Sequence, residues 1–411
     1  MLTVDDARAR ILADATPLGA ETVPLGLARG RVLARDVTAR RTQPPQAMSA
    51  MDGWALRSAD LGHGHRTFRV IGEARAGEGF GGDVGPGEAV RIFTGAPVPP
   101  GADLVVIQED TRVTGHHDSG APAAVEITGE RADAEAGDNI RPAGIDFQTG
   151  AVGLQAGRGL EARAIALAAA MGHPWLPVHR RPRVAILATG DELARPGEPL
   201  GPDAIVDAVS PCLTALFADA GADVVDLGIA PDARDRIDAQ IATARGADLL
   251  VTIGGASVGD HDLVQAALLA AGAEIDFWKI AMRPGKPLMY GRLGGMPVLG
   301  LPGNPVSAYV CSLLFALPLI DRLSGRQPRD AASERLPLAA PVAANAMRQH
   351  YMRARLLRDG DGAETVLPVR DQDSSLLSAL ADADALILRR PHAPAAEPGE
   401  LVDILRLDRL D

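Results

Sequence analysis

Short apolar runs alternate with helix-like stretches between Arg183 and about Leu323, and this alternation is the clearest pattern in the chain. The runs RVAILATG, DVVDLGI and DLLVTIGG are compact, whereas the stretches between them place apolar side chains at helical spacing. A run EIDFWKI and a helix beginning at Asn304-Pro305 continue the series. The pattern predicts a doubly wound α/β domain over residues 179–325.

β-like runs of a different kind occupy both flanks of this region. TFRVIGEA, EAVRIFTG, DLVVIQED and AAVEITGE, separated by glycine and proline, predict a β-rich domain over residues 43–149. HYMRARLL, ALILRR and LVDILRL predict a C-terminal β-barrel-like domain over residues 326–411. The chain is therefore expected to be a multi-domain α/β and β protein with a central α/β domain.

Two helices are predicted outside these domains. Thr3 followed by Asp6 resembles a capping box, which predicts a short helix from Val4 to Ala15. The stretch LEARAIALAAAMG predicts a second helix, ahead of a Pro- and Arg-rich linker. We therefore group residues 1–42 with 150–178 as one helical and extended domain.

Length and composition narrow the protein class. With 411 residues, 46% hydrophobic and 23% charged, the chain is expected to be a soluble globular protein of several domains. No stretch reaches the roughly 20 uninterrupted apolar residues of a bilayer crossing, and MLTVDDARAR has no apolar signal core. We expect a cytoplasmic protein without a membrane partner, whose Cys212 and Cys311 are buried, inert thiols.

The net charge of −12 argues against sequence-independent nucleic-acid binding, which needs a basic face. An anionic ligand must then be captured by a local basic pocket. Lys279, Arg283 and Lys286 are the strongest candidates, and two of them lie in the stiff turn RPGKP.

Polar residues gather where the predicted parallel strands end, which is where open α/β sheets bind ligands. Three loops carry them: Asp191 and Glu192 follow one strand, Asp232 a second, and a glycine-rich loop the third. That third loop contains Gly254, Gly255, Ser257, Asp260 and Asp262. Glycines let backbone N–H groups approach an anion closely, and carboxylates beside an anion suit a bridging divalent metal. Helix capping is the alternative role of the aspartates.

The first β-rich domain carries three further motifs. SAMDGWA sets Asp52 in a tight Asp-Gly turn, RIFTGAPVPPGAD places Thr94 at a strand end, and NIRPAGIDF contains Arg141 and Asp146. Two nucleotide-binding motifs are rejected. The GxGxxG match at Gly77 leads into no helix, which argues against dinucleotide binding, and Gly285-Lys286 lacks the rest of the Walker A loop of a P-loop NTPase.

Taken together, SAMDGWA, RIFTGAPVPPGAD, NIRPAGIDF, ATGDEL, GGASVGDHD, FWKIAMRPGKP and GLPGNPVSA resemble, in order and over nearly the whole chain, the MoeA family of molybdopterin molybdenumtransferases. That family is related to the E domains of gephyrin and of the plant enzyme. The resemblance implies an elongated homodimer with four domains per chain, in which residues 1–42 with 150–178 serve dimerisation. The active cleft is then expected between the α/β domain of one subunit and a β domain of the other.

The resemblance also implies the last step of molybdenum cofactor synthesis: adenylylated molybdopterin and molybdate react with Mg²⁺ to give the cofactor and AMP. A molybdopterin adenylyltransferase is the implied substrate donor. The implied catalytic residues are Asp52, Thr94, Asp146 and Lys279. The implied substrate-binding residues are Arg141, Gly254, Gly255, Ser257, Asp262, Arg283, Lys286, Pro287, Arg353 and Ser374. Glu192 and Asp232 are the implied metal ligands, although a carboxylate can equally accept hydrogen bonds from the pterin.

Two departures from the family pattern are visible. Arg283 stands where many relatives carry lysine, which keeps the charge but changes its shape. In RDQDSSLLSAL, Asp373 replaces a small residue and adds negative charge beside Ser374. The alternative functions are a non-catalytic scaffold on the same fold, and a nucleotide hydrolase related to competence-damage-inducible proteins.

Overall fold

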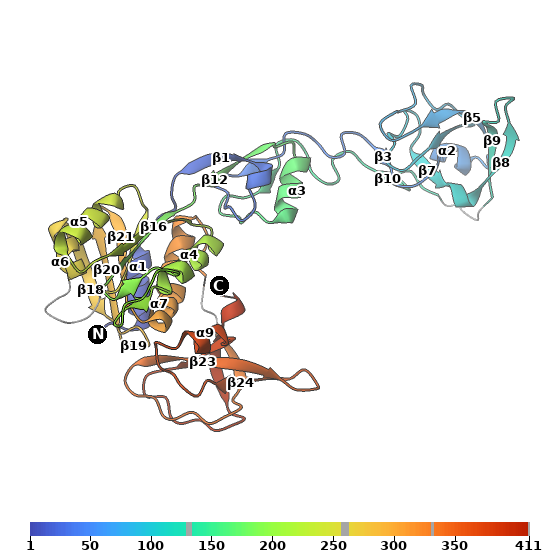
Figure 1. The fold of residues 1–411 in the computed structure, drawn as a ribbon. Helices are drawn as coiled ribbons and strands as arrows, with labels where there is room; N and C mark the ends of the chain where they lie inside the picture. The colour runs from blue at the N-terminus through green and yellow to red at the C-terminus, as the bar shows by residue number, and fades with distance from the viewer. Residues whose placement is uncertain (129–133, 256–262, 330–332, 410–411) are drawn as a thin grey trace.

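The computed structural model describes residues 1–128, 134–255, 263–329 and 333–409. Figure 1 shows an elongated molecule in which the α/β unit and the C-terminal β unit lie together at one end. A slender middle region connects them to a β-rich unit at the opposite end. The predicted fold class, a central α/β unit flanked by β-rich units, is confirmed.

The far β-rich unit is built on a six-stranded sheet with the strand order β7-β4-β6-β5-β9-β8. Apolar side chains pack on both faces, with Phe68 and Val125 in one cluster and Val90 and Ile92 in another. Its elements are β3 (Met48–Ser49), β4 (Gly53–Leu56), α2 (Ser58–Gly62), β5 (Thr67–Ala74), β6 (Glu88–Ile92), β7 (Leu104–Ile107), a 3₁₀ turn (Gln108–Asp110), β8 (Thr111–His116), β9 (Pro122–Ile127) and β10 (Ile140–Arg141). All four runs predicted here form strands.

The middle region is a narrow stack of two strand pairs and a helix. Strand β1 pairs antiparallel with β12, and β2 pairs antiparallel with β11. Leu33, Leu154 and Met171 are fully buried in its small core. Its elements are β1 (Ala20–Pro24), a 3₁₀ turn (Leu25–Leu27), β2 (Val37–Thr38), β11 (Val152–Leu154), α3 (Ala162–Ala170) and β12 (Trp175–His179).

The α/β unit contains a six-stranded sheet with the order β16-β13-β17-β21-β20-β18. Strand β13 pairs in parallel with β16 and β17, and β17 pairs in parallel with β21. Strand β20 runs antiparallel to both of its neighbours, so β18 points the same way as the parallel strands. The strands are β13 (Arg183–Thr189), β16 (Asp223–Ala230), β17 (Leu249–Ile253), β18 (Ala273–Lys279), β20 (Pro287–Leu293) and β21 (Met296–Leu301), with a small pair β14 (Leu193–Ala194) and β15 (Ile205–Val206) beside them.

Helices cover both faces of this sheet because its central strands are apolar on both sides. In β13, Val184 and Ile186 face one core, whereas Ala185 and Leu187 face the other. The first core is covered by α1, α4, α7 and α8, and the second by α5 and α6. Their bounds are α4 (Val209–Asp219), α5 (Arg234–Thr243), α6 (Leu263–Ala270), α7 (Pro305–Cys311), a π turn (Ser312–Ala316) and α8 (Leu317–Leu323).

The stretch from Pro305 to Leu323 is long and apolar enough to cross a membrane, yet most of it is buried in the fold. It is the central core helix of the α/β unit.

Helix α1 (Val4–Ala13) differs from the sequence-based domain assignment. Thr3 caps it as predicted, because its hydroxyl accepts from the backbone N–H of Asp6 at 3.1 Å. However, Val4, Ala7 and Ile11 pack into the α/β core rather than into the middle region, which begins with β1 at Ala20. Their helical spacing gives one apolar face, and the sequence did not reveal which core that face joins.

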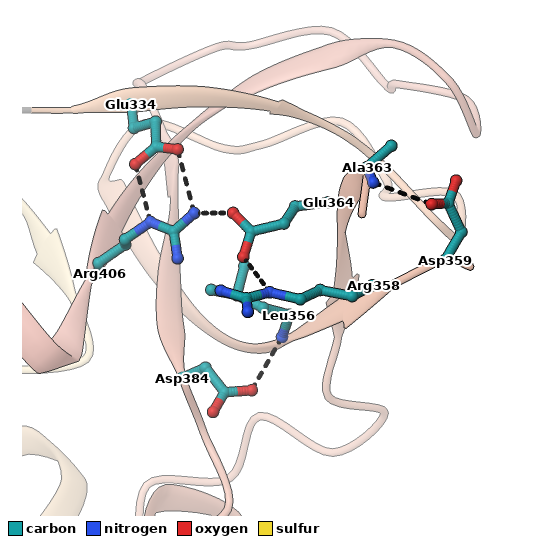
Figure 2. A network of polar contacts seen from close by, with 8 residues as sticks. All are labelled: Glu334, Leu356, Arg358, Asp359, Ala363, Glu364, Asp384 and Arg406. Atoms are coloured by element: carbon teal, nitrogen blue, oxygen red, sulfur yellow. Dashed lines mark hydrogen bonds and ion pairs between the residues drawn. The ribbon is translucent and has the colours of Figure 1, made fainter. Parts of the chain in front are cut away.

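The C-terminal unit is a sheet with the order β19-β23-β25-β26-β22, to which β24 adds through β23. Figure 2 shows how Arg406 bridges Glu334 and Glu364, while Arg358 donates to Glu364 at 2.8 Å. These charge-assisted bonds lower the pKa of Glu364. The elements are β19 (Met282–Arg283), β22 (Glu334–Pro337), β23 (Gln349–Arg358), β24 (Glu364–Pro368), α9 (Leu377–Ala381), β25 (Ala385–Arg389), β26 (Leu401–Arg406) and a 3₁₀ turn (Leu407–Arg409).

Candidate functional site

The carboxyl ends of β13, β16, β17, β21 and β18 lie along one edge of the α/β sheet, because these strands share a direction. The predicted loops therefore meet there. Asp191 and Glu192 follow β13, Asp232 follows β16, and Gly254-Gly255 follow β17. Lys279 ends β18 and lies opposite Pro287 in the strand register.

A cavity of about 630 Å³ opens at this edge. Glu192, Gly254, Gly255 and Pro287, four of the candidate site residues from the sequence, line it. The C-terminal unit also contributes to its wall, through residues 375 and 377. A second hollow of about 650 Å³ lies between α5, α6 and the β20–β21 turn, and none of the predicted site residues lines it.

The glycine loop after β17 is held in a conformation that other residues rarely adopt. Gly254 and Gly255 have φ of +86° and +61°. A Cβ atom on Gly254 would lie 2.8 Å from the carbonyl oxygen of Thr189, so the close approach of this loop to the end of β13 requires glycine. The following residues of the motif, including Ser257 and Asp262, lie outside the described residues.

Three carboxylates crowd the β13 and β16 ends of the edge. The backbone N–H of Asp232 donates to Asp191 at 3.0 Å. Partial burial raises the pKa of Asp232, and the nearby charges of Asp191 and Glu192 raise it further. Capping does not explain Asp232, because α5 has no side-chain cap.

Within the described residues no group of three or more His, Cys, Asp or Glu side chains is arranged to hold a metal ion. Mg²⁺ commonly uses only one or two carboxylates, with water and substrate phosphates as its other ligands. The carboxylates of Asp191 and Glu192, which add to the effect of burial in raising the pKa of Asp232, fit such a partial site.

The cations lie at the opposite end of the same edge. Gly285, in the turn RPGKP, has φ of +97°, and a Cβ atom there would lie 2.4 Å from the Sγ atom of Cys311. The turn closes back on β18, because the N–H of Ile280 donates to the carbonyl of Lys286 at 3.1 Å. Lys279 and Lys286 are exposed, and neither has a carboxylate partner in the part of the chain that the structure describes.

Arg283 lies at the boundary with the C-terminal unit. It belongs to the short strand β19, which pairs in parallel with β23 so that Arg283 lies opposite His350. Burial lowers the pKa of His350 to about 4, and the charges of Arg283 and three further arginines add to this effect.

Arg353 differs from its predicted role. It is only 1% exposed, and its guanidinium donates to the carbonyl oxygens of Asp371, Asp373 and Leu376 at 2.8–3.1 Å. This placement makes Arg353 a positioning residue, because it shapes the loop that carries Ser374 instead of facing the cavity.

Ser374 is joined by hydrogen bonds to the start of α7, next to the wall of the cavity. The side-chain amide of Asn304 donates to its hydroxyl at 3.1 Å, and the N–H of Val306 donates to its carbonyl at 3.1 Å. Asn304 is the N-cap residue of α7, as predicted, but its side chain bonds Ser374 instead of the first turn of the helix. The charge of Asp373 is partly satisfied within its own turn, by the N–H and hydroxyl of Ser375.

Sequence reasoning missed Asp207. It lines the cavity, is 7% exposed, and accepts the backbone N–H groups of Val209 and Ser210 at 3.0 Å, which caps α4. An aspartate two residues before an apolar helical run was the available signal.

The three motifs of the far β-rich unit meet around Ser49, which is fully buried. Its N–H donates to Ala96 at 2.8 Å, its carbonyl accepts from Gly95 at 2.9 Å, and it lies opposite Ile140 in the register. The SAMDGWA, TGAP and NIRPAG segments are thus joined by backbone hydrogen bonds.

Asp52 and Thr94 are brought into direct contact there. The backbone N–H and the hydroxyl of Thr94 both donate to one Asp52 oxygen at 2.8 Å, and these bonds lower the pKa of Asp52. Arg141 ends β10, and Asp146 lies farther along the same exposed loop. Figure 1 places this unit at the far end of the molecule, so these residues do not reach the α/β cavity within one chain.

Known proteins share this arrangement. The profile of the MoeA N-terminal region (domain I and II) matches residues 2–172, that of a probable molybdopterin binding domain residues 185–322, and that of the MoeA C-terminal region (domain IV) residues 335–407. The molybdopterin molybdenumtransferase of Haemophilus influenzae is 34% identical over 98% of both chains. That of Bacillus subtilis is 34% identical over 98% of this chain and 94% of its own.

A solved structure extends the likeness to three dimensions. The molybdopterin biosynthesis MoeA protein from Pyrococcus horikoshii superposes with a TM-score of 0.84 at 28% identity, covering 99% of each chain. Sequence profiles over all three regions, full-length relatives and a full-length structural match agree. The chain belongs to the MoeA family of molybdopterin molybdenumtransferases.

Proposed function

We propose that this protein inserts molybdenum from molybdate into adenylylated molybdopterin and releases AMP, as the last step of molybdenum cofactor biosynthesis. The observation that carries the proposal is the sheet edge, where the cavity and its glycine loop lie between crowded carboxylates at one end and two exposed lysines at the other, neither of which has a carboxylate partner among the described residues. Two anionic reactants and a divalent cation together satisfy such a charge arrangement. A pure scaffold gains nothing from keeping it.

Each part of the edge has a defined task in this proposal. Gly254 turns the loop, with its own N–H donating to the carbonyl of Leu301 at 3.2 Å, so that Gly255 presents its backbone N–H to the terminal phosphate of the pterin substrate. Lys279, Arg283 and Lys286 hold molybdate and phosphate oxygens, and Pro287 and Ser374 shape the wall beside them. Bound Mg²⁺ at Glu192 or Asp232 supplies charge neutralisation at the phosphates.

Two hydrogen bonds from Thr94 hold the Asp52 carboxylate in one orientation and keep it ionised, so that it can accept a proton at a fixed place, as a weaker base than an ordinary aspartate. A water molecule that loses its proton to Asp52 attacks the adenylyl phosphorus; the bond to the pterin phosphate breaks, and AMP leaves. Arg141 and Asp146 lie on the same unit and complete this half of the site.

Because the two halves lie at opposite ends of one chain, we propose that the working site joins the α/β unit of one subunit to the β-rich unit of a second copy. The same proposal includes a cytoplasmic homodimer that receives its substrate from a molybdopterin adenylyltransferase.

The test incubates the purified protein with adenylylated molybdopterin, Mg²⁺ and molybdate, and measures AMP release and reconstitution of an apo-molybdoenzyme. We expect AMP release that depends on molybdate. If AMP is released equally fast with and without molybdate, the protein is a nucleotide hydrolase. If no AMP is released in either condition, the transferase proposal is wrong.

Mixed dimers test the shared site. Lys279→Ala and Asp52→Ala proteins are each expected to be inactive, but a mixed dimer has one site with both halves intact. Random mixing of the two variants should therefore restore about a quarter of wild-type activity, since half of the dimers are mixed and each has one good site of two. If mixing restores nothing, both halves belong to the same chain.

A further inference from the structure

Arg91 occupies an unusual position next to Asp52 and Thr94. It lies on β6 directly opposite Trp54 of β4 in the strand register. Its guanidinium carbon is 4.9 Å from the ring centre of Trp54 and 5.1 Å from that of Phe93. Two aromatic rings therefore fix the guanidinium by cation–π contacts.

The surroundings make this position rigid. Trp54 is 2% exposed, and its indole N–H donates to the hydroxyl of Thr111 at 3.0 Å. Strand β4 reaches this depth because it begins at Gly53, where a Cβ atom would lie 2.0 Å from the carbonyl oxygen of Val106. The Asp-Gly-Trp sequence thus places the acid and the ring that holds Arg91 two residues apart, at the start of β4.

The hydrogen-bonding capacity of Arg91 is mostly unused. Its Nη2 atom donates to the side-chain oxygen of Gln108 at 2.7 Å, and no carboxylate pairs with it among the residues that the structure describes. Other arginines of the same sheet are ion-paired: Arg69 with Glu88, and Arg112 with Glu126. A guanidinium has five N–H donors, so several remain for a ligand.

Gln108 also connects Arg91 to the proposed acid. The backbone N–H of Gln108 donates to the carbonyl of Asp52 at 3.1 Å, while its side chain accepts from Arg91. The charge of Arg91 is close enough to help keep the Asp52 carboxylate ionised. A planar cation with free donors therefore lies beside a carboxylate and a hydroxyl.

We propose that Arg91 binds the adenylyl phosphate of the substrate, so that the nucleotide end of the substrate is the part brought to Asp52 and Thr94. This inference rests on the proposed function. An exposed carboxylate alone repels a phosphate, whereas a fixed guanidinium offers two parallel N–H donors to its oxygens and offsets that repulsion.

The experiment compares Arg91→Gln and Arg91→Lys with wild type in molybdate-dependent AMP release, and measures binding of adenosine 5′-monophosphate to each by calorimetry. Arg112→Gln is the matched control, since it removes one positive charge from the same sheet without touching Asp52. Loss of a charge-assisted phosphate contact should raise KM and the Kd for the nucleotide by about 10- to 100-fold in Arg91→Gln. Arg91→Lys should lose less, and Arg112→Gln should match wild type.

The outcomes separate the explanations. If wild type is active but Arg91→Gln keeps its KM and nucleotide affinity, and only the acid limb of its pH profile moves, Arg91 merely positions Asp52 and the inference is wrong. If wild type releases no AMP, the proposed function fails, while nucleotide affinity still tests Arg91. If Arg91→Gln does not fold, nucleotide affinity is measured in Arg91→Lys and in Phe93→Leu instead. Weaker affinity supports the proposal, and unchanged affinity in both variants overturns it.

Discussion

Replacing Arg353 by alanine distinguishes a structural arginine from a substrate ligand. Its buried guanidinium donates to the carbonyl oxygens of Asp371, Asp373 and Leu376. Hydrogen bonds from a charged donor contribute about 1.5–3 kcal/mol each at most, and hydration of the loop in the variant recovers part of this. We therefore expect Arg353→Ala to weaken the local structure of residues 369–377 by about 2–4 kcal/mol.

Hydrogen–deuterium exchange detects this change directly. Peptides that span residues 369–377 should exchange about 30- to 1,000-fold faster, because each 1.4 kcal/mol is a factor of ten in the opening equilibrium. Peptides from the far β-rich unit should not change. With the loop loosened, the Asn304–Ser374 contact weakens and KM for molybdate should rise more than kcat falls.

Arg355→Ala is the control. Arg355 is two residues along the same strand and is exposed. Its removal should change local stability by less than about 0.5 kcal/mol. If Arg353→Ala keeps wild-type exchange over residues 369–377 and still loses turnover, the guanidinium contacts substrate and the positioning role is wrong.

Three further results are expected. Lys279→Ala and Asp52→Ala should each lower the rate of AMP release by about 10²-fold or more with an unchanged thermal midpoint; unfolding of either variant would indicate a structural role. Gly285→Ala should destabilise the protein by about 2–4 kcal/mol in thermal unfolding, because its φ is +97° and its Cβ meets Cys311, and Cys311→Ala should relieve part of this cost. His350 has a folded-state pKa of about 4, below its unfolded value, so its neutral form stabilises the fold. Stability should fall by up to about 3 kcal/mol as pH drops from about 6.5 to 4, and His350→Gln should remove that dependence.

The sequence predicted the elements whose patterns are local. The runs before Thr189, Asp232 and Gly254 form the parallel strands, because continuous apolar runs between glycine and proline are typical of buried strands. Strand β4 was missed, since four residues beginning with glycine give no periodic signal. The partner of α1 was also missed, because an apolar helix face does not say which core it joins.

The candidate site was predictable where residue type alone determines the chemistry. Glu192 and Gly254 line the cavity because they follow strands that share one edge, and Pro287 lines it because the antiparallel strand β20 begins at that edge. Arg353 could not be assigned from its charge, since the carbonyls that surround it come from a loop about twenty residues away. The role of Asp207 depends on the start of α4, and the boundaries of helices are the least certain part of any sequence prediction.

The strand order limits what the site can bind. The carboxylates follow β16 and β13, whereas Lys279 and Lys286 flank the end of β18 and the start of β20. Strands β17 and β21 lie between them, so β13 and β20 are three spacings apart, or about 14 Å. A single tetrahedral oxyanion cannot contact both groups, whereas an extended substrate lying across Gly254 and the loop after β21 can. The separation of acidic and basic side chains along this edge therefore favours a long phosphorylated ligand over a single small oxyanion.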